Sequence, residues 1–299
     1  MLRLALILMA LAAALAVPAA AKVNVVASTP ELGSIAKMIG GANVSVVSLA
    51  RVNQDYHKVE ARPSDVTQVS RADLLIRIGM DLDLWVDALI RAARNSRVSE
   101  GGRGYVDASA MIRRMDVPSE RVTGASGDIH AQGNPHFWLD PGNAKVIAYQ
   151  ILLGLRRVDA KNASSYDAAY KKFTAEIERR MKGWKDTLAP FRGRSVVAYH
   201  DEWVYFAQRF GLKEFGFLEP KPGIPPSGGH ISSLISRMKQ GKAKSIIVPS
   251  IYPMKFPEMV AKETGAKIAR VPYSVGSVGT KDYFGYMDAI VNGIARALK

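Results

Sequence analysis

Short runs of β-branched and aliphatic residues alternate with helical segments along most of this 299-residue chain, and the alternation occurs twice. This pattern is typical of βαβ units, in which helices connect the parallel strands of one sheet. The predicted strands are Val23–Ala27, Val44–Leu49, Leu74–Ile78 and Tyr105–Asp107 in the first half, and Arg194–Ala198, Glu214–Phe217, Ser245–Val248 and Lys267–Val271 in the second. A helix is also expected to begin at Pro63–Asp65, and the other predicted helices are Leu32–Ile39, Leu82–Ala93, Trp203–Phe210, Ile231–Lys239, Pro257–Thr264 and Tyr283–Leu298. We therefore expect an α/β protein with two parallel sheets.

A long, mostly helical stretch separates the two series of strands. It runs from Asn143 to about Leu188 and is broken near Asp159–Ala163. Its second helix, Ser164–Leu188, would span about 37 Å at about 1.5 Å per residue, which is the width of a small domain. We predict two βα lobes with parallel sheets joined by one long spine helix. The predicted divisions are a signal peptide over residues 1–21, an N-terminal lobe over 22–142, a helical connector over 143–190 and a C-terminal lobe over 191–299.

The first 21 residues have the pattern of a secretory signal peptide. Arg3 supplies the positive charge, Leu4–Val17 is an uninterrupted apolar run, and Ala19–Ala21 offers small residues for cleavage. The apolar run is shorter than the roughly 20 residues that cross a bilayer, and an uncleaved anchor is the alternative. The chain has no cysteine to which a lipid could be attached. We expect a mature protein that starts at Lys22 and is soluble in the periplasm, without a lipid anchor.

Composition narrows the classes of function. The chain carries 41 Lys and Arg against 27 Asp and Glu, a formal net charge of +14. These basic residues are scattered rather than gathered with aromatic residues, so we expect no nucleic-acid partner. The absence of cysteine excludes disulfide scaffolds, thiolate zinc sites and cysteine nucleophiles. Any metal site in this chain must therefore use His, Asp or Glu.

Three of the five histidines lie where a ligand site is expected. His57 follows the second predicted strand, His136 lies between two prolines in NPHFWLDP, and His200 comes just after the first strand of the second series. Ligands of open α/β sheets bind beyond the carboxyl ends of the strands, so these loops should face a cleft between the lobes. Each histidine alone could be an ordinary polar side chain. Three imidazoles together suit Zn²⁺, which binds nitrogen in tetrahedral geometry.

Two acidic residues lie close to these histidines in the sequence. Asp140 follows His136 by four residues, and Asp201 follows His200 directly. Either carboxylate could accept a hydrogen bond from a histidine ring and fix its orientation. Either could equally cap the following helix.

Three motifs together resemble those of one protein family. They are NPHFWLDP, HDEW after a strand, and the pattern from His57 to PSD at Asp65. With a long helix between two βα lobes, they are similar to the periplasmic solute-binding proteins of zinc and manganese ABC importers, cluster A-I. The resemblance implies a monomeric binding protein, not an enzyme, that takes one metal ion per chain and passes it to an ABC permease in the inner membrane. It implies one ligand each from His57, His136 and His200, and the histidine at the third position favours Zn²⁺.

The sequence departs from this family where a fourth ligand is expected. An acidic residue usually follows the last strand, but this chain has RVPYSVGS, with Pro272 at that position. A water molecule or another side chain could complete the site. The candidates are Glu60, His130 from the Gly-rich stretch Thr123–Asn134, Glu202 and Ser274.

Two other functions could use the same histidines. A receptor for Mn²⁺ or Fe²⁺ would share the architecture, although those ions prefer oxygen ligands. A periplasmic zinc hydrolase could use Glu202 or Asp201 as the base for a zinc-bound water, but the HExxH pattern is absent. His230, in PPSGGHISSL, is expected to begin a helix rather than to bind metal.

Overall fold

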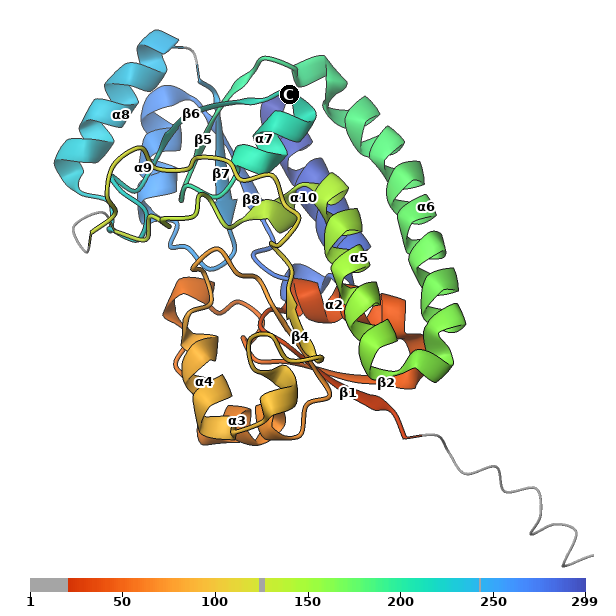
Figure 1. Ribbon diagram of the computed structural model, residues 1–299. Coiled ribbons are helices and arrows are strands. Elements are labelled where there is room, and N and C mark those ends of the chain that lie inside the picture. Colours follow the sequence, from red (N-terminus) through yellow and green to blue (C-terminus); the bar gives the residue numbers. More distant parts are fainter. Residues whose placement is uncertain (1–20, 124–126, 242) are drawn as a thin grey trace, which may run out of the picture.

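The computed structural model describes residues 21–123, 127–241 and 243–299 (Figure 1). The predicted signal peptide, apart from Ala21, and part of the Gly-rich stretch lie outside these residues. Among the helices of the described ranges, none is long and apolar enough to cross a membrane.

The first sheet is built from four parallel strands in the order β2-β1-β3-β4. Its strands are β1 (Val23–Ala27), β2 (Val44–Ser48), β3 (Leu74–Arg77) and β4 (Tyr105–Asp107). Helices α2 (Pro30–Gly40), α3 (Pro63–Ser70) and α4 (Trp85–Ala93) connect them. Such a sheet needs apolar cover on both faces, and the four residues of β3 are all buried.

The second sheet repeats this arrangement with the order β6-β5-β7-β8, again all parallel. Its strands are β5 (Ser195–Ala198), β6 (Lys213–Phe217), β7 (Ser245–Pro249) and β8 (Lys267–Val271). The helices are α7 (Val204–Phe210), α8 (Gly228–Gly241), α9 (Lys255–Thr264) and the closing α10 (Tyr283–Leu298). The two lobes therefore share one strand order, which confirms the α/β two-lobe prediction.

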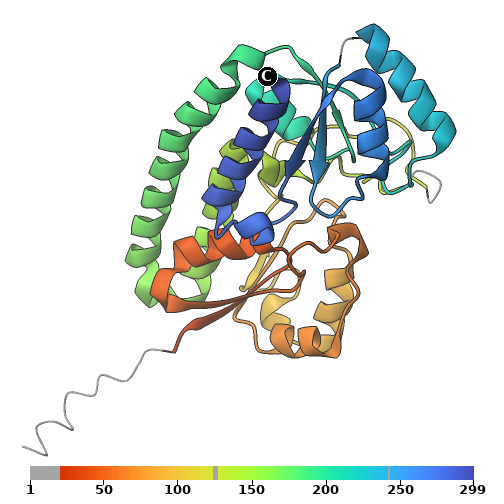
Figure 2. The same cartoon turned by 180° about the vertical axis from the view of Figure 1, so that it is seen from behind.

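Helices α5 (Pro141–Val158) and α6 (Ala163–Leu188) lie between the two sheets in the sequence and along one side of both in space (Figures 1 and 2). The 26 residues of α6 span about 39 Å at about 1.5 Å per residue, and short 3₁₀ turns flank both ends. This helix contacts α2 of the first lobe and α10 of the second. It is the spine helix that the sequence predicts.

One hydrophobic core runs through both lobes. It joins the inner face of the first sheet to α2, α5, α6, α10 and the second sheet. Separate clusters fill the outer sides, beneath α3 and α4 in the first lobe and beneath α8 and α9 in the second. Because the main core is shared, the lobe boundaries at 142 and 190 remain a prediction.

One predicted helix begins later than expected. The sequence predicts a helix over Leu82–Ala93, but α4 starts at Trp85. Met80 and Asp81 have positive φ angles of 50° and 64°, which a helix cannot contain. The Asp83 carboxylate accepts hydrogen bonds from backbone N–H groups in the preceding turn, so this segment closes the end of β3 instead.

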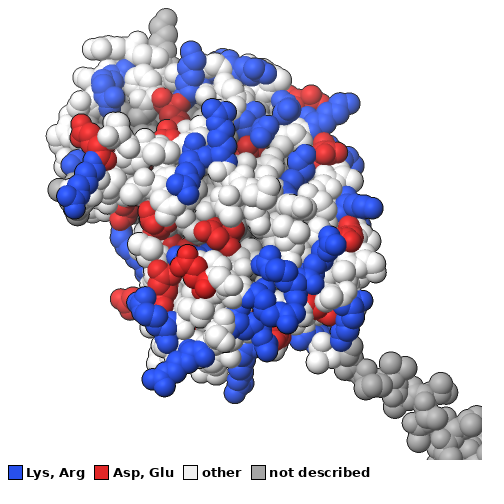
Figure 3. All heavy atoms as spheres, in the orientation of Figure 1, with Lys and Arg blue, Asp and Glu red and all other residues white. Residues whose placement is uncertain are grey.

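The charge is spread over the surface. On the face drawn in Figure 3, Lys and Arg side chains lie over both lobes rather than in one patch. Acidic side chains gather mainly near the junction of the lobes at the left of that view.

Candidate metal centre

The structure brings the three predicted histidines together from three separate loops. His57 lies in a 3₁₀ turn (Tyr56–Lys58) after β2, His136 immediately precedes a 3₁₀ turn (Phe137–Leu139), and His200 follows β5. Their ring centroids lie 5.1–5.4 Å apart. One ligand atom from each ring lies within 4.8 Å of the others. His57 and His136 are 79 residues apart in the sequence, and His136 and His200 are 64 apart. The three loops thus meet where the carboxyl ends of the two sheets face each other.

Two of the rings are oriented by the same local geometry. The carboxylate of Asp55 accepts hydrogen bonds from the backbone N–H of His57 and from its ring Nδ1, both at 3.0 Å. The amide oxygen of Asn134 accepts equally from the backbone N–H of His136 at 3.1 Å and from its Nδ1 at 2.8 Å. In both cases an acceptor two residues earlier holds the ring.

The third ring has a distant acceptor. The carboxylate of Glu219, which follows β6, accepts from Nδ1 of His200 at 2.7 Å. Because β5 and β6 are neighbours in the sheet, their carboxyl ends bring these two residues together. Glu219 is itself held by the backbone N–H of Gly223 at 2.9 Å.

These hydrogen bonds decide which ring nitrogen is free. An acceptor on Nδ1 keeps the proton there, so Nε2 retains its lone pair. The Nε2 atoms of His57 and His200 are buried and have no hydrogen-bond partner among the described residues. Buried polar atoms without partners are rare, and the binding of an ion is one of the ordinary explanations. The arrangement of carboxylate or amide, imidazole and a free Nε2 is the one found around protein-bound zinc.

The rings differ in how easily they take up protons. Burial, reinforced by the neighbouring His57 and His200 rings, holds the pKa of His136 well below its ordinary value near 6.5. Burial would also lower the pKa of His200, but its bond to Glu219 and the nearby Glu202 outweigh that effect and raise it. At neutral pH, His136 therefore presents a lone pair, whereas His200 is the ring more easily protonated.

Two of the four candidate side chains for a fourth ligand lie beside the site. Glu202 is 3% exposed, its Oε1 has no hydrogen-bond partner among the described residues, and burial raises its pKa to about 8. The His130 ring lies 5.3 Å from that of His57, centroid to centroid, and its buried Nε2 likewise lacks a partner in the described ranges. Burial and the nearby His57 lower the pKa of His130 to about 4.

The other two candidates have different surroundings. Glu60 is exposed on the surface. The hydroxyl of Ser274 is buried and accepts a hydrogen bond from the backbone N–H of Asn53 at 3.0 Å, so it links the lobes. The segment that has Pro272 in place of an acidic residue contributes the hydroxyl of Tyr273, which accepts from the backbone N–H of Tyr56 at 3.1 Å.

The two acidic residues predicted beside the rings have other partners. Asp140 caps α5 by accepting from the N–H of Gly142, and it forms a bidentate ion pair with Arg209 at 2.6 and 2.7 Å. Asp201 accepts from the side-chain amide of Asn134 and is thus one step removed from His136. The hydrogen bonds to the rings come instead from Asp55, Asn134 and Glu219, which the sequence reasoning missed. Acceptors two positions before a histidine, D-x-H and N-x-H, were the available signal for the first two.

The fifth histidine lies elsewhere. His230 is in the first turn of α8, and its Nε2 is bonded to the backbone carbonyl of Phe217 at 2.9 Å. A ring so engaged at a helix start has an ordinary polar role, as the sequence predicts.

Comparisons show that the chain is similar to known proteins of metal uptake. A family described as zinc-uptake complex component A, periplasmic (ZnuA), matches residues 25–297. The high-affinity zinc uptake system protein ZnuA of Yersinia pestis is 26% identical, covering 93% of this chain and 92% of that protein. The manganese ABC transporter substrate-binding lipoprotein PsaA of Streptococcus mitis is 24% identical, covering 92% of this chain and 90% of that one. A crystal structure of ZnuA, 24% identical, has the same fold with a TM-score of 0.78, covering 93% of this chain and all of that one.

Proposed function

Since the chain belongs to the ZnuA family of periplasmic zinc-uptake components, we propose that it captures one Zn²⁺ between its lobes through His57, His136 and His200 and delivers it to an ABC permease in the inner membrane. Membership of this family makes it a metal-binding substrate-binding protein of an ABC importer. The choice of ion and the identity of the ligands are the parts that we propose.

One observation carries the proposal: three imidazoles converge, and each has its Nδ1 already bonded to an acceptor. The remaining nitrogens of His57 and His200 are buried without partners among the described residues. A cation at their centre would satisfy them and would replace the water that burial has removed. The ligands come from both sides of the lobe junction, so capture also joins the lobes.

The donor set favours zinc over harder ions. Mn²⁺ and Fe²⁺ bind better where carboxylates supply oxygen, whereas three neutral imidazoles suit Zn²⁺. A relative named for manganese shows that the family fold accommodates other ions. A receptor for Mn²⁺ or Fe²⁺ is therefore the alternative, and it would need the Glu202 carboxylate as a ligand.

The fourth position belongs, in our proposal, to Glu202, to His130 or to a water molecule. Glu202 already lies beside His200, and deprotonation on metal binding would turn its buried carboxyl into a carboxylate ligand. His130 lies beside His57 and offers a nitrogen that remains neutral down to low pH. Glu60 and Ser274 receive no support from their surroundings.

A hydrolase is a poorer interpretation of the same residues. The HExxH pattern of zinc hydrolases is absent from the chain, and Glu202 is one of the candidates for the fourth ligand rather than a free base. Asp201 has a pKa raised to about 6 by burial, and its carboxylate accepts a hydrogen bond from the side chain of Asn134. The relatives named above are transport proteins.

The location and the partners are part of the proposal. The amino-terminal signal pattern supports a soluble protein in the periplasm, the absence of cysteine supports one without a lipid anchor, and we propose that it acts as a monomer. The PsaA relative is named a lipoprotein, so this chain would work with its permease without that tether.

The test is a competition titration with a chelator of known affinity, using Zn²⁺ and Mn²⁺. The wild type should bind one equivalent of Zn²⁺ that Mn²⁺ does not displace. His136→Ala should weaken zinc binding by about 100-fold or more, because it removes a first ligand. His230→Ala is the matched control and should bind like the wild type. Equal losses in both variants would reject the ligand assignment, and preference for Mn²⁺ would reject the choice of ion.

A further inference from the structure

A buried acidic side chain outside the metal centre joins the two lobes. Glu31 lies in the first turn of α2 and is fully buried. Its Oε1 accepts a hydrogen bond at 2.9 Å from the backbone N–H of Val275, in the segment after β8 of the other lobe. Its Oε2 accepts one at 2.8 Å from the hydroxyl of Tyr56, the residue directly before His57. One carboxyl group therefore contacts both the second lobe and the metal-binding loop.

The hydroxyl, the backbone N–H and the carbonyl of Tyr56 each form a hydrogen bond. Its hydroxyl donates to Glu31, its backbone N–H donates to the hydroxyl of Tyr273 at 3.1 Å, and its carbonyl accepts from the Trp85 ring at 3.1 Å. Its ring packs against that of Tyr273 with centroids 4.9 Å apart. Because His57 is the next residue, its backbone position is fixed by what holds Tyr56.

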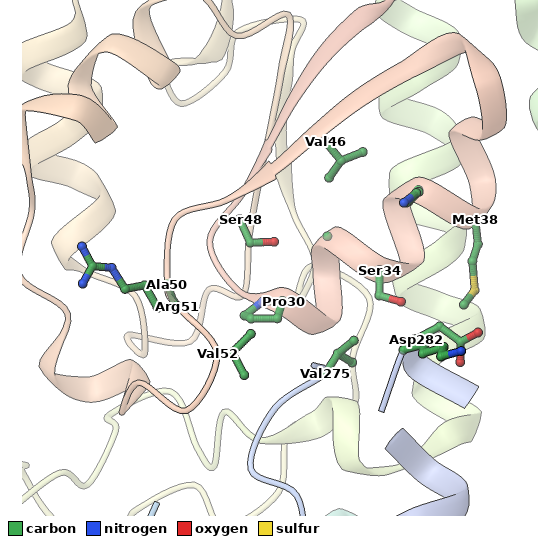
Figure 4. A pocket seen from close by; sticks show the side chains of 13 residues that line it. Pro30, Ser34, Met38, Val46, Ser48, Ala50, Arg51, Val52, Val275 and Asp282 are labelled. Atoms are coloured by element: carbon green, nitrogen blue, oxygen red, sulfur yellow. The ribbon is translucent and has the colours of Figure 1, made fainter. Parts of the chain in front are cut away.

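The lobe junction beside Glu31 is hollow on its outer side. A cavity of about 720 Å³ lies there between α2, β2 and the segment after β8. Figure 4 shows Pro30, Val52 and Val275 around it. Pro30 and Val275, the neighbours of Glu31 on the two lobes, thus line this cavity, while Val275 also belongs to the main core. The two hydrogen bonds of Glu31 add to the packing of α2 and Val275 in the main core.

We propose that Glu31 is a positioning residue for metal binding: through Tyr56 it holds His57 in place against the second lobe and so slows release of the ion. This inference rests on the proposed function, since it needs His57 to be a ligand. Glu31 touches no metal ligand itself and acts only through Tyr56 and Val275. Loss of either hydrogen bond would leave the loop before His57 joined to the other lobe only by its remaining contacts, such as the bond from Tyr56 to Tyr273.

The test compares Glu31→Gln, Tyr56→Phe and the double variant in the full mature chain. Chelator competition gives the zinc affinity, and stopped-flow transfer to the chelator gives the dissociation rate. Each single variant should bind zinc about 10-fold to 100-fold more weakly, mainly through faster dissociation, as for other residues that orient a ligand. The double variant should be little worse than the singles, because both changes break one connection. Additive losses, or unchanged affinity in both single variants, would overturn the proposal.

Ser34→Ala is the matched control. Its hydroxyl accepts from the backbone N–H of Tyr283 at 3.0 Å, so this bond also links α2 to the second lobe but does not involve Tyr56 or His57. Its zinc affinity should match the wild type. If Ser34→Ala loses as much affinity as Glu31→Gln, Glu31 is a general structural contact and the proposal fails.

The absorption spectrum of bound Co²⁺ separates positioning from stability. The ligand-field bands should change shape in Glu31→Gln and Tyr56→Phe, where His57 is displaced, and should remain as in the wild type in Ser34→Ala. Unchanged bands in all three variants would contradict the proposal. A wild type that binds neither Co²⁺ nor Zn²⁺ would instead reject the proposed function, so the two failures can be told apart.

Discussion

At the scale of single residues, the candidate site depends on acceptors that fix each ring. Asp55 and Asn134 act on the histidine two positions later, and each also accepts that histidine's backbone N–H. The double hydrogen bond sets the ring and the main chain together. Such partners raise the basicity of a ligand and hold it ready for the ion.

Asn134→Ala should therefore weaken zinc binding by about 10-fold to 100-fold without removing a ligand. The His136 ring would lose the partner that keeps its proton on Nδ1. Asn143→Ala is the control, because the side chain of Asn143 donates to the carbonyl of Phe137 rather than to a histidine ring. Chelator competition on both variants gives the comparison, and an unchanged Asn134→Ala would show that the ring needs no acceptor.

Glu31 also predicts an unusual dependence of stability on pH. Burial raises its pKa from 4.5 to about 7, so between these values the folded protein holds a proton that the unfolded chain has released. The stabilisation that this pKa difference gives the folded protein is therefore fully present below about pH 4.5. It is lost as the pH rises through 7 and Glu31 releases its proton. Relative to Glu31→Gln, the metal-free wild type should lose about 2 kcal/mol of unfolding free energy between pH 5 and 7.5. Denaturant unfolding at both pH values, with a chelator present, measures this difference, and a constant difference would contradict the pKa shift.

The sequence predicts the three histidines at this scale but not their partners. His57, His136 and His200 were found because each follows a strand or lies between prolines, where loops converge. Glu219 was missed because its contact with His200 depends on the pairing of β5 with β6, which no local pattern specifies. Proximity in sequence was the wrong guide for Asp140, whose carboxylate turns toward Gly142 and Arg209.

At the scale of elements, helix starts and strand ends place the site. The 3₁₀ turn that follows His136 leads directly into α5, whose first turn is capped by Asp140. Arg209 of α7 completes the cap by pairing with the same carboxylate, so a helix of the second lobe is tied to the start of the connector. The sequence predicts these helices because the apolar periodicity and the prolines are local features. It fails at the start of α4, where positive φ angles at Met80 and Asp81 depend on the turn around Asp83.

Asp140→Ala should cost about 2 kcal/mol of unfolding free energy, since it removes a helix cap and the partner of Arg209. Its effect on zinc affinity should be much smaller than that of Asn134→Ala. Urea unfolding and chelator competition on the two variants separate the roles. If Asp140→Ala instead weakened zinc binding more than Asn134→Ala does, Asp140 would have to act on the His136 ring.

At the scale of the whole molecule, the shared core and the spine helix limit how far the lobes can separate. The main core passes from one sheet to the other through α2, α5, α6 and α10. A hinge that opened widely would have to break this packing. Metal capture should therefore involve small displacements and ordering of loops.

Spin labels can measure this displacement, because the chain has no native cysteine to interfere. Labels at Arg91→Cys on α4 and Lys262→Cys on α9 report on the two lobes. Zinc should shift their distance by only about 1–2 Å, the scale of helix adjustments within a packed interface. A pair at Lys172→Cys and Lys185→Cys along α6 should not change. A shift many times larger between the lobes would contradict a rigid spine.

The central claim is that one zinc ion binds the three histidines. Anomalous diffraction from crystals grown with one equivalent of Zn²⁺, recorded on both sides of the zinc absorption edge, tests it most directly. The account predicts a single peak about 2.0–2.1 Å from a nitrogen of each of His57, His136 and His200. A peak elsewhere, such as at His230, or no peak at this site, would contradict it.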